Sequence, residues 1–197
     1  MSQTGCSDAI MMVDHDPLWS VSFALEASLI KEALADIHPT VVHIGSTAIP
    51  GICAKPIIDI MAGVDDMKDC RIVSSLEKIG YIFQPDAGEP DRLFFRKGAT
   101  RTHHLHVVNI HSWTYSRHLI FRDYLLTHPS ICVQYGELKR ASAEKYRFDR
   151  TAYTNSKTEF IDSVLRTATE IAFIKVSGQY AQENVSHPLC ESDVLRR

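Results

Sequence analysis

Residues 56–64, PIIDIMAGV, are apolar at almost every position and lack the alternation of a strand with one solvent-facing side. The run therefore predicts a strand buried on both faces, at the centre of a sheet. Asp59 lies in the middle of it. An ionised carboxylate in such a strand is costly unless a metal ion, a cation or hydrogen-bond donors compensate its charge. The same run thus constrains the fold and marks a candidate site.

The segments around this run predict a sheet with helices on its flanks. Residues 41–46, 81–84, 92–98 and 103–110 have the short apolar or alternating pattern of strands. Asp16-Pro17 is a typical helix start, and residues 66–79 are typical of a second helix that Gly80 ends. The first helix is expected to bury one face, formed by Trp19, Phe23, Leu25, Leu29, Ile30 and Leu34.

After Trp113 the pattern is helical. One helix is predicted over 115–128, a second from Pro129 and a third from Ser156, where Ser-Lys-Thr-Glu forms a capping box. We predict one α+β domain over residues 11–178, with a mixed sheet and flanking helices in 11–112 and a C-terminal helical half in 113–178. Residues 1–10 and 179–197 are predicted to be flexible tails.

The composition limits the classes of function. The chain has 197 residues and a formal net charge of -3, so it lacks the basic surface that nonspecific nucleic-acid binding needs. No apolar run approaches the roughly 20 residues of a membrane helix, and the N-terminus does not have a signal-peptide pattern. Five cysteines without a C-x-x-C pair fit a reducing, cytoplasmic setting. Sustained heptads are absent, so the oligomeric state stays open.

Gly45-Ser46 ends the strand before Asp59. A strand that runs into a Gly-Ser turn presents backbone N–H groups and a hydroxyl to an anion. Two interpretations of Asp59 stay open. It is a functional carboxylate, or it caps a turn or pairs with Lys55 or an arginine.

This spacing resembles the signature of the nucleotidyltransferase superfamily, and the whole chain resembles the GrpB family, a branch of that fold. In active members the Gly-Ser turn holds a triphosphate, and two carboxylates on one strand with a third nearby hold two divalent ions. Gly45 and Ser46 match the turn and Asp59 matches the first carboxylate, but Met61 occupies the second position, and a thioether does not bind Mg²⁺ usefully. The stretches that carry the resemblance cover about residues 13–172: DHDPLWSVSF, HIGSTAIPGICAKPIIDI, LFFRKG, THHLHVV, HLIFRDYLLTHP, YGELK and YTNSKTEFI.

The strand HHLHVV is the expected place for the remaining ligands. His104 and His106 share one face of it, as Asp59 and Met61 do on theirs. If these faces coincide, Asp59, His104 and His106 form a site for Zn²⁺, Mn²⁺ or Fe²⁺. The alternative is that both histidines line a polar cleft and form hydrogen bonds to substrate or backbone. The implied cofactors are a divalent metal (Mg, Mn or Zn) and an NTP.

Several cations are candidates for an anion pocket between the two halves. Together with Gly45 and Ser46, the residues expected to bind phosphate are Lys55, Arg92, Arg96, Arg122, Lys139, Tyr153 and Lys157.

Three functions fit these residues. The first is metal-dependent transfer of a nucleotidyl group from an NTP to an unknown acceptor, with Ser46 on phosphate and Asp59 on metal. The second is a non-catalytic module that binds a nucleotide or a phosphorylated metabolite. The third is a metal-dependent phosphoesterase that uses His104 and His106 with Asp59. All three predict a nucleotide or phosphorylated small molecule as the partner, with no membrane and no nucleic acid.

Overall fold

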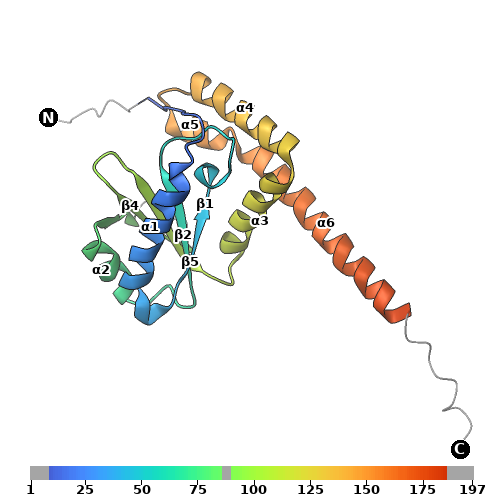
Figure 1. The fold of residues 1–197 in the computed structure, drawn as a ribbon, viewed down its shortest axis with the longest axis horizontal. Helices are drawn as coiled ribbons and strands as arrows, with labels where there is room; N and C mark the ends of the chain where they lie inside the picture. Colours follow the sequence, from blue (N-terminus) through green and yellow to red (C-terminus); the bar gives the residue numbers. More distant parts are fainter. Residues whose placement is uncertain (1–8, 86–89, 186–197) are drawn as a thin grey trace, which may run out of the picture.

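In the computed structural model, residues 9–85 and 90–185 are described, with side chains described to residue 173. The centre is a five-stranded sheet in the order β1-β2-β5-β4-β3 (Figure 1). Only β2 and β5 are paired in parallel, and the other neighbours are antiparallel. The predicted mixed sheet, with PIIDIMAGV as an inner strand, is confirmed. The strands are β1 Thr40–Ile44, β2 Ile58–Val64, β3 Tyr81–Phe83, β4 Arg92–Lys97 and β5 His103–Asn109.

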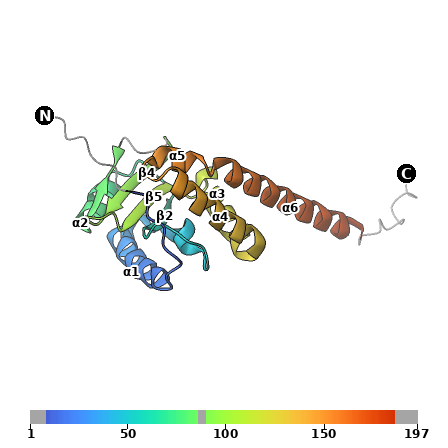
Figure 2. The ribbon, with the colours of Figure 1, turned by 90° about the horizontal axis from the view of Figure 1, so that it is seen from above.

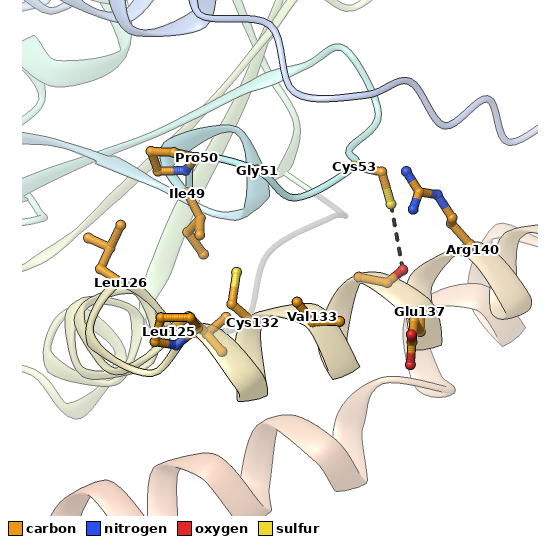
Figure 3. Close-up of a pocket in the computed structure, with 12 residues that line it drawn as sticks. Ile49, Pro50, Gly51, Cys53, Leu125, Leu126, Cys132, Val133, Glu137 and Arg140 are labelled. Carbon is orange, nitrogen blue, oxygen red and sulfur yellow. Dashed lines mark hydrogen bonds between the residues drawn. The ribbon is translucent and has the colours of Figure 1, made fainter.

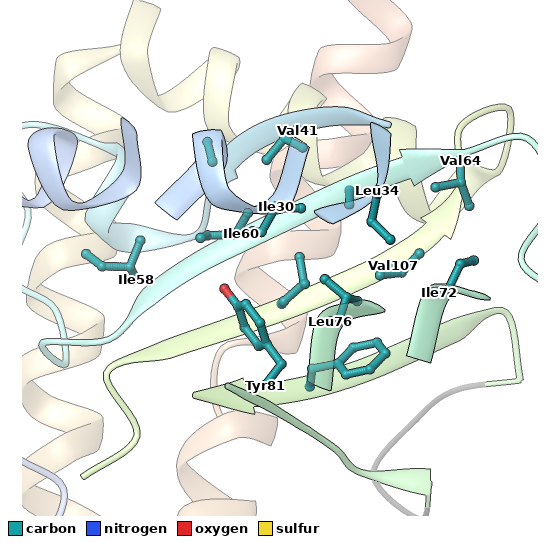
Figure 4. Packing of buried hydrophobic residues seen from close by; sticks show 14 of the residues in the cluster. Ile30, Leu34, Val41, Ile58, Ile60, Val64, Ile72, Leu76, Tyr81 and Val107 are labelled. Atoms are coloured by element: carbon teal, nitrogen blue, oxygen red, sulfur yellow. The ribbon is translucent and has the colours of Figure 1, made fainter. Parts of the chain in front are cut away.

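One face of the sheet is covered by α1 (Leu18–Ala33) and α2 (Arg71–Lys78). Asp16 Oδ1 accepts a hydrogen bond from the backbone N–H of Leu18 at 2.9 Å, which satisfies a free donor at the start of α1. Figure 4 shows the core between these layers, and its labelled members are Ile30, Leu34, Val41, Ile58, Ile60, Val64, Ile72, Leu76, Tyr81 and Val107. Burial of these side chains is the main stabilising term for this half.

The face of α1 differs in part from the prediction. Trp19, Ile30 and Leu34 are buried as expected, but Leu25 and Leu29 are 67% and 43% exposed. The buried face instead includes Glu26, whose Oε1 accepts a hydrogen bond from Lys97 Nζ at 2.7 Å. A paired carboxylate can occupy a position that the sequence pattern assigns to solvent.

The C-terminal helical half covers the other face of the sheet. Ser112 caps α3 by accepting a hydrogen bond from the backbone N–H of Tyr115, and Pro129 occupies the first turn of α4. Beyond its contact with α3, α6 extends away from the body in both views (Figures 1 and 2). The helices are α3 Trp113–Thr127, α4 Pro129–Lys145, α5 Arg150–Asn155 and α6 Thr158–Val185. Two short 3-10 turns, η1 Ala35–Ile37 and η2 Ser46–Ala48, complete the fold.

The described structure extends beyond both predicted limits of the domain, residues 11 and 178. Ile10 is buried beside Ala143 and Tyr153, and its N–H donates a 2.8 Å hydrogen bond to the carbonyl of Arg147. At the other end, residues 179–185 continue α6, because each further helical residue adds a backbone hydrogen bond once the helix exists. Residues 1–8 and 186–197 lie outside the described part. Among the described helices, none has the length and apolar character needed to cross a membrane.

Candidate functional site

A cavity of about 190 Å³ lies where the sheet meets the helical half. The sheet contributes the turn after β1 and residues of β2 and β5, while α4, α5 and the α5–α6 junction contribute the opposite wall. Its lining residues are Gly45, Ser46, Thr47, Ala54, Lys55, Ile57, Asp59, His104, Tyr135, Lys139, Tyr153 and Lys157. Most residues that the sequence singled out therefore lie together.

Gly45 brings the backbone directly against Asp59. Its φ of +68° lies in the region that favours glycine. A Cβ placed on Gly45 would lie 2.7 Å from Asp59 Oδ2, closer than real Cβ atoms come to other atoms. Ser46 then begins η2, so the Gly-Ser turn and the carboxylate form one wall of the cavity.

Asp59 is held by His104. The two residues are partners in the parallel β2–β5 register, and His104 Nδ1 lies 3.1 Å from Asp59 Oδ1. Burial acts to raise the pKa of Asp59, but the hydrogen bond from His104 and the charges of His104, His106 and Lys55 outweigh it and lower the pKa. Asp59 is therefore ionised at neutral pH, and its side chain remains 32% exposed.

Lysines from three different segments converge on this carboxylate. Lys55 precedes β2, Lys139 lies on α4 and Lys157 lies between α5 and α6. Lys157 Nζ lies 3.9 Å, and Lys55 Nζ 5.4 Å, from the centroid of the Tyr153 ring. Lys139 Nζ lies 5.5 Å from the centroid of the Tyr135 ring and donates a hydrogen bond to the carbonyl of Cys53. The aromatic rings thus hold the ammonium groups inside the cavity.

Burial disfavours the charged form of these three lysines. It lowers the pKa of Lys139 to about 7 and that of Lys157 to about 8, and it also lowers the pKa of Lys55. Repulsion from neighbouring positive charges lowers these pKa values further, whereas attraction to Asp59 raises them. The cavity therefore holds more positive than negative charge, and an added anion would stabilise it.

The residues expected to complete a metal site are not brought together. Met61 is fully buried in an apolar cluster with Ile44, Val108 and Tyr115. His106 is the register partner of Met61 on β5. Its Nδ1 lies 3.3 Å from Arg92 Nη1, and burial lowers the pKa of His106 to about 3. Across residues 9–85 and 90–173, no three His, Cys, Asp or Glu side chains form a group that could hold a metal ion.

Three arginines predicted to bind phosphate do not line the cavity. Arg122 donates from Nη1 to the carbonyl of His43 at 2.8 Å and from Nε to Asp123, so it ties α3 to β1. Arg92 and Arg96 lie on β4, each 5.4 Å from the centroid of the Phe94 ring. Arg96 is nevertheless the register partner of the cavity residue His104.

Comparison with known proteins accounts for this combination of sheet, Gly-Ser turn and helical half. A family model described as GrpB protein matches residues 9–167. The chain belongs to the GrpB family. It is 41% identical to a UPF0157 protein of Pseudomonas aeruginosa, over 96% of this chain and 74% of the relative. It is 36% identical to the glutamate-rich protein GrpB of Alkalihalophilus pseudofirmus, over 79% of this chain and 94% of the relative.

A solved structure supports the fold. The crystal structure described as conserved protein GrpB from Enterococcus faecalis matches with a TM-score of 0.75 at 32% identity. The match covers 83% of this chain and 99% of that one. The α+β architecture with its C-terminal helical part is therefore that of a GrpB protein.

Tyr135 is an ionisable cavity residue that the sequence analysis did not identify. It lies in the GrpB-like stretch YGELK, one helical turn before Lys139 on α4. Because residues four apart share a helix face, the position of Lys139 was the signal that could have identified it. Burial raises the pKa of Tyr135, and the pKa of Tyr153 rises to about 12, so both hydroxyls stay neutral.

This GrpB chain also has a larger cavity, of about 440 Å³, on the other side of the Ile49–Ala54 loop (Figure 3). Cys53 closes the wall between the two, because its carbonyl accepts from Lys139 while its Sγ lies 3.6 Å from the carbonyl of Gly136. The larger cavity is mostly apolar, and the guanidinium of Arg140 at its edge is bound to Asp14 at 2.6 Å. The ionisable groups with shifted pKa values favour the smaller cavity as the functional site.

Proposed function

We propose that this GrpB protein binds a phosphate-bearing small molecule, with a nucleotide as the leading class, in the lysine-lined cavity. The observation that carries the proposal is the convergence of Lys55, Lys139 and Lys157 on one cavity, in which Asp59 is the only acidic lining residue within residues 9–85 and 90–173. A phosphate group supplies further negative charge and further hydrogen-bond acceptors for these ammonium groups.

The Gly-Ser turn is the second support for phosphate. The hydroxyl of Ser46 and the backbone at the start of η2 lie in the same cavity as the lysines. In nucleotidyltransferases, which the chain resembles, this turn holds the triphosphate. The resemblance makes an NTP the first nucleotide to test.

Metal-dependent transfer is less well supported than binding. It needs several oxygen or nitrogen ligands around one ion, and among the described residues the donor set here is Asp59 with His104. The second carboxylate position is Met61, and the side chain of His106 is engaged with Arg92. The residues present do not fit a two-metal centre, nor the three-ligand site of a phosphoesterase.

Calorimetric titration tests the proposal directly. Inorganic phosphate, pyrophosphate and ATP, each with EDTA, should bind the wild-type protein, and Lys157→Gln should weaken each by about tenfold or more, because one charge-assisted contact is lost. Lys145→Gln, an exposed substitution on α4 outside the cavity, is the matched control and should bind as wild type.

Asp59→Asn separates binding from metal chemistry. It removes the negative charge that Asp59 contributes to the cavity, so phosphate in EDTA should bind more tightly to this variant than to wild type. If Mg²⁺ or Mn²⁺ is required and Asp59→Asn abolishes binding, the metal-free proposal is wrong. If none of the three anions binds the wild type, the cavity is not a phosphate site.

A further inference from the structure

Three arginines lie close in the fold to residues that line the cavity or adjoin it. Arg96 on β4 is the register partner of His104. Arg150 begins α5, one turn before Tyr153 on the same helix. Arg101 lies in the β4–β5 turn, where the carbonyl of the next residue, Thr102, accepts a 2.9 Å hydrogen bond from the N–H of Ile58 at the start of β2. We call Arg96, Arg101 and Arg150 the arginine rim.

The rim is a concentration of positive charge without a carboxylate partner. Within residues 9–85 and 90–173, none of its guanidinium groups forms an ion pair, whereas Arg71, Arg122 and Arg140 elsewhere do. Arg96 Nε is buried and has no hydrogen-bond acceptor among these residues. A buried donor without an acceptor is costly, so a bound anion would stabilise the site.

The rim and the cavity are close enough to interact electrostatically. Burial lowers the pKa of Arg96, and the charges of Arg101 and Arg150 lower it further. The same two arginines lower the pKa of Lys55 inside the cavity. Arg101 is also held at a φ of 60°, a backbone conformation uncommon for a residue with a side chain. The rim therefore extends the positive potential of the cavity outward.

The size of the cavity limits what it can enclose. Sites that enclose a whole drug-sized ligand have volumes of about 300–1,000 Å³. The lysine cavity has about 190 Å³, so a ligand of that size would extend out of it toward the rim.

We propose that the ligand carries two separated anionic groups, a phosphate held by the cavity lysines and a second anion held by Arg96, Arg101 and Arg150. The chemical class is a small bisphosphate, or a phosphate ester with a carboxylate at its other end. Guanidinium groups are suited to either anion, because their donors match the paired oxygens of phosphate and carboxylate. This inference rests on the proposed phosphate site and adds the second half of its ligand.

A series of synthetic alkanediol bisphosphates tests it. Each bisphosphate, with spacers from two to eight carbons, is compared by calorimetry with the alkyl monophosphate of the same length. At the spacer that spans both sites, wild type should prefer the bisphosphate by about tenfold or more, as expected for one added charge-assisted contact. The double variant Arg101→Gln/Arg150→Gln should reduce that preference to about twofold or less. Both positions are exposed, so the fold should persist.

The control removes the same charge elsewhere. Lys31→Gln/Arg166→Gln changes two exposed cations that do not line the cavity, and it should keep the wild-type preference. If wild type binds monophosphates through Lys157 but prefers no bisphosphate at any spacer length, the second anion site is wrong and the phosphate site stands. If the control loses the preference as fully as the rim variant, general electrostatics and not the rim explains it, and the inference is overturned. If wild type binds no monophosphate, the phosphate site itself fails.

Discussion

Gly45 and Asp59 lie directly against each other in one wall of the lysine-lined cavity. The turn can approach the carboxylate only because glycine has no Cβ and tolerates a φ of +68°. Gly51, in the next loop, has a φ of +78° but faces open space, since a Cβ added there would meet no atom of the described residues within 4 Å beyond its chain neighbours. Substitutions at the two glycines therefore distinguish the effect of backbone strain from the effect of contact with Asp59.

Gly45→Ala should destabilise the protein by roughly 2–4 kcal/mol and abolish phosphate binding, because Asp59 must move away from the new methyl group. Gly51→Ala has the backbone strain alone and should cost about 1 kcal/mol while it keeps phosphate binding. Urea unfolding and calorimetry measure the two effects. Equal losses in both variants would show that strain, and not the contact with Asp59, dominates.

At the scale of the strand, β2 explains what happened to the second carboxylate position. Asp59 and Met61 share a face, but Asp59 opens into the lysine cavity whereas Met61 is covered by Tyr115 of α3. The packing of α3 on the sheet thus makes one position polar and the other apolar. The thioether fits its surroundings as a core side chain.

Met61→Asp should therefore not restore a metal site. A carboxylate there enters a fully buried apolar cluster, and we expect a loss of several kcal/mol in the free energy of unfolding. Met61→Leu keeps the volume and should cost less than about 1.5 kcal/mol. Thermal unfolding with and without Mn²⁺ measures both. A Met61→Asp protein that Mn²⁺ restores to wild-type stability would contradict this account.

Individual strands and helices also show which features could be predicted from the sequence. The both-faces apolar pattern of β2 and the Gly-Ser turn predicted the centre of the sheet and one wall of the cavity, because strand periodicity depends on local sequence. The predictions that failed depend on tertiary contacts. Leu25 and Leu29 matched helical spacing, yet both are exposed, and the buried face of the helix instead includes Glu26, which is paired with Lys97. Periodicity also could not show that the lysines enter the cavity while Arg122 binds the backbone of β1.

For the whole molecule, the buried lysines link stability to pH. In the unfolded chain Lys139 keeps its proton up to about pH 10, but in the fold its pKa is about 7. Between these values the unfolded state binds more protons, so the free energy of unfolding should rise with pH, by up to about 1.4 kcal/mol per pH unit. Lys157 adds to this slope above pH 8.

Urea unfolding at pH 7, 8 and 9 without ligand measures that slope. Lys139→Met should reduce the slope, because the variant has no ammonium group to bury at position 139. The exposed substitution Lys31→Met should keep the wild-type slope. Sulfate, whose charge is constant over this range, should show the opposite trend and bind less tightly as pH rises, since only the protonated lysines attract it. A slope that Lys139→Met leaves unchanged would show that Lys139 is not the titrating group.

The contacts of the segment around Ile10 affect how the protein folds. The N–H of Ile10 donates to the carbonyl of Arg147, Val13 pairs with Ala54, and the hydroxyl of Tyr153 lies 3.6 Å from the sulfur of Met12. Two of these contacts, those of Ile10 and Met12, join the first described residues to elements more than a hundred positions later, and the parallel pairing of β2 with β5 adds another distant contact. Such contacts slow folding, since a long loop must close before they form. A growing chain on the ribosome cannot complete the lysine-lined cavity until Lys157 has emerged, so the proposed anion binding would be a late event in its synthesis.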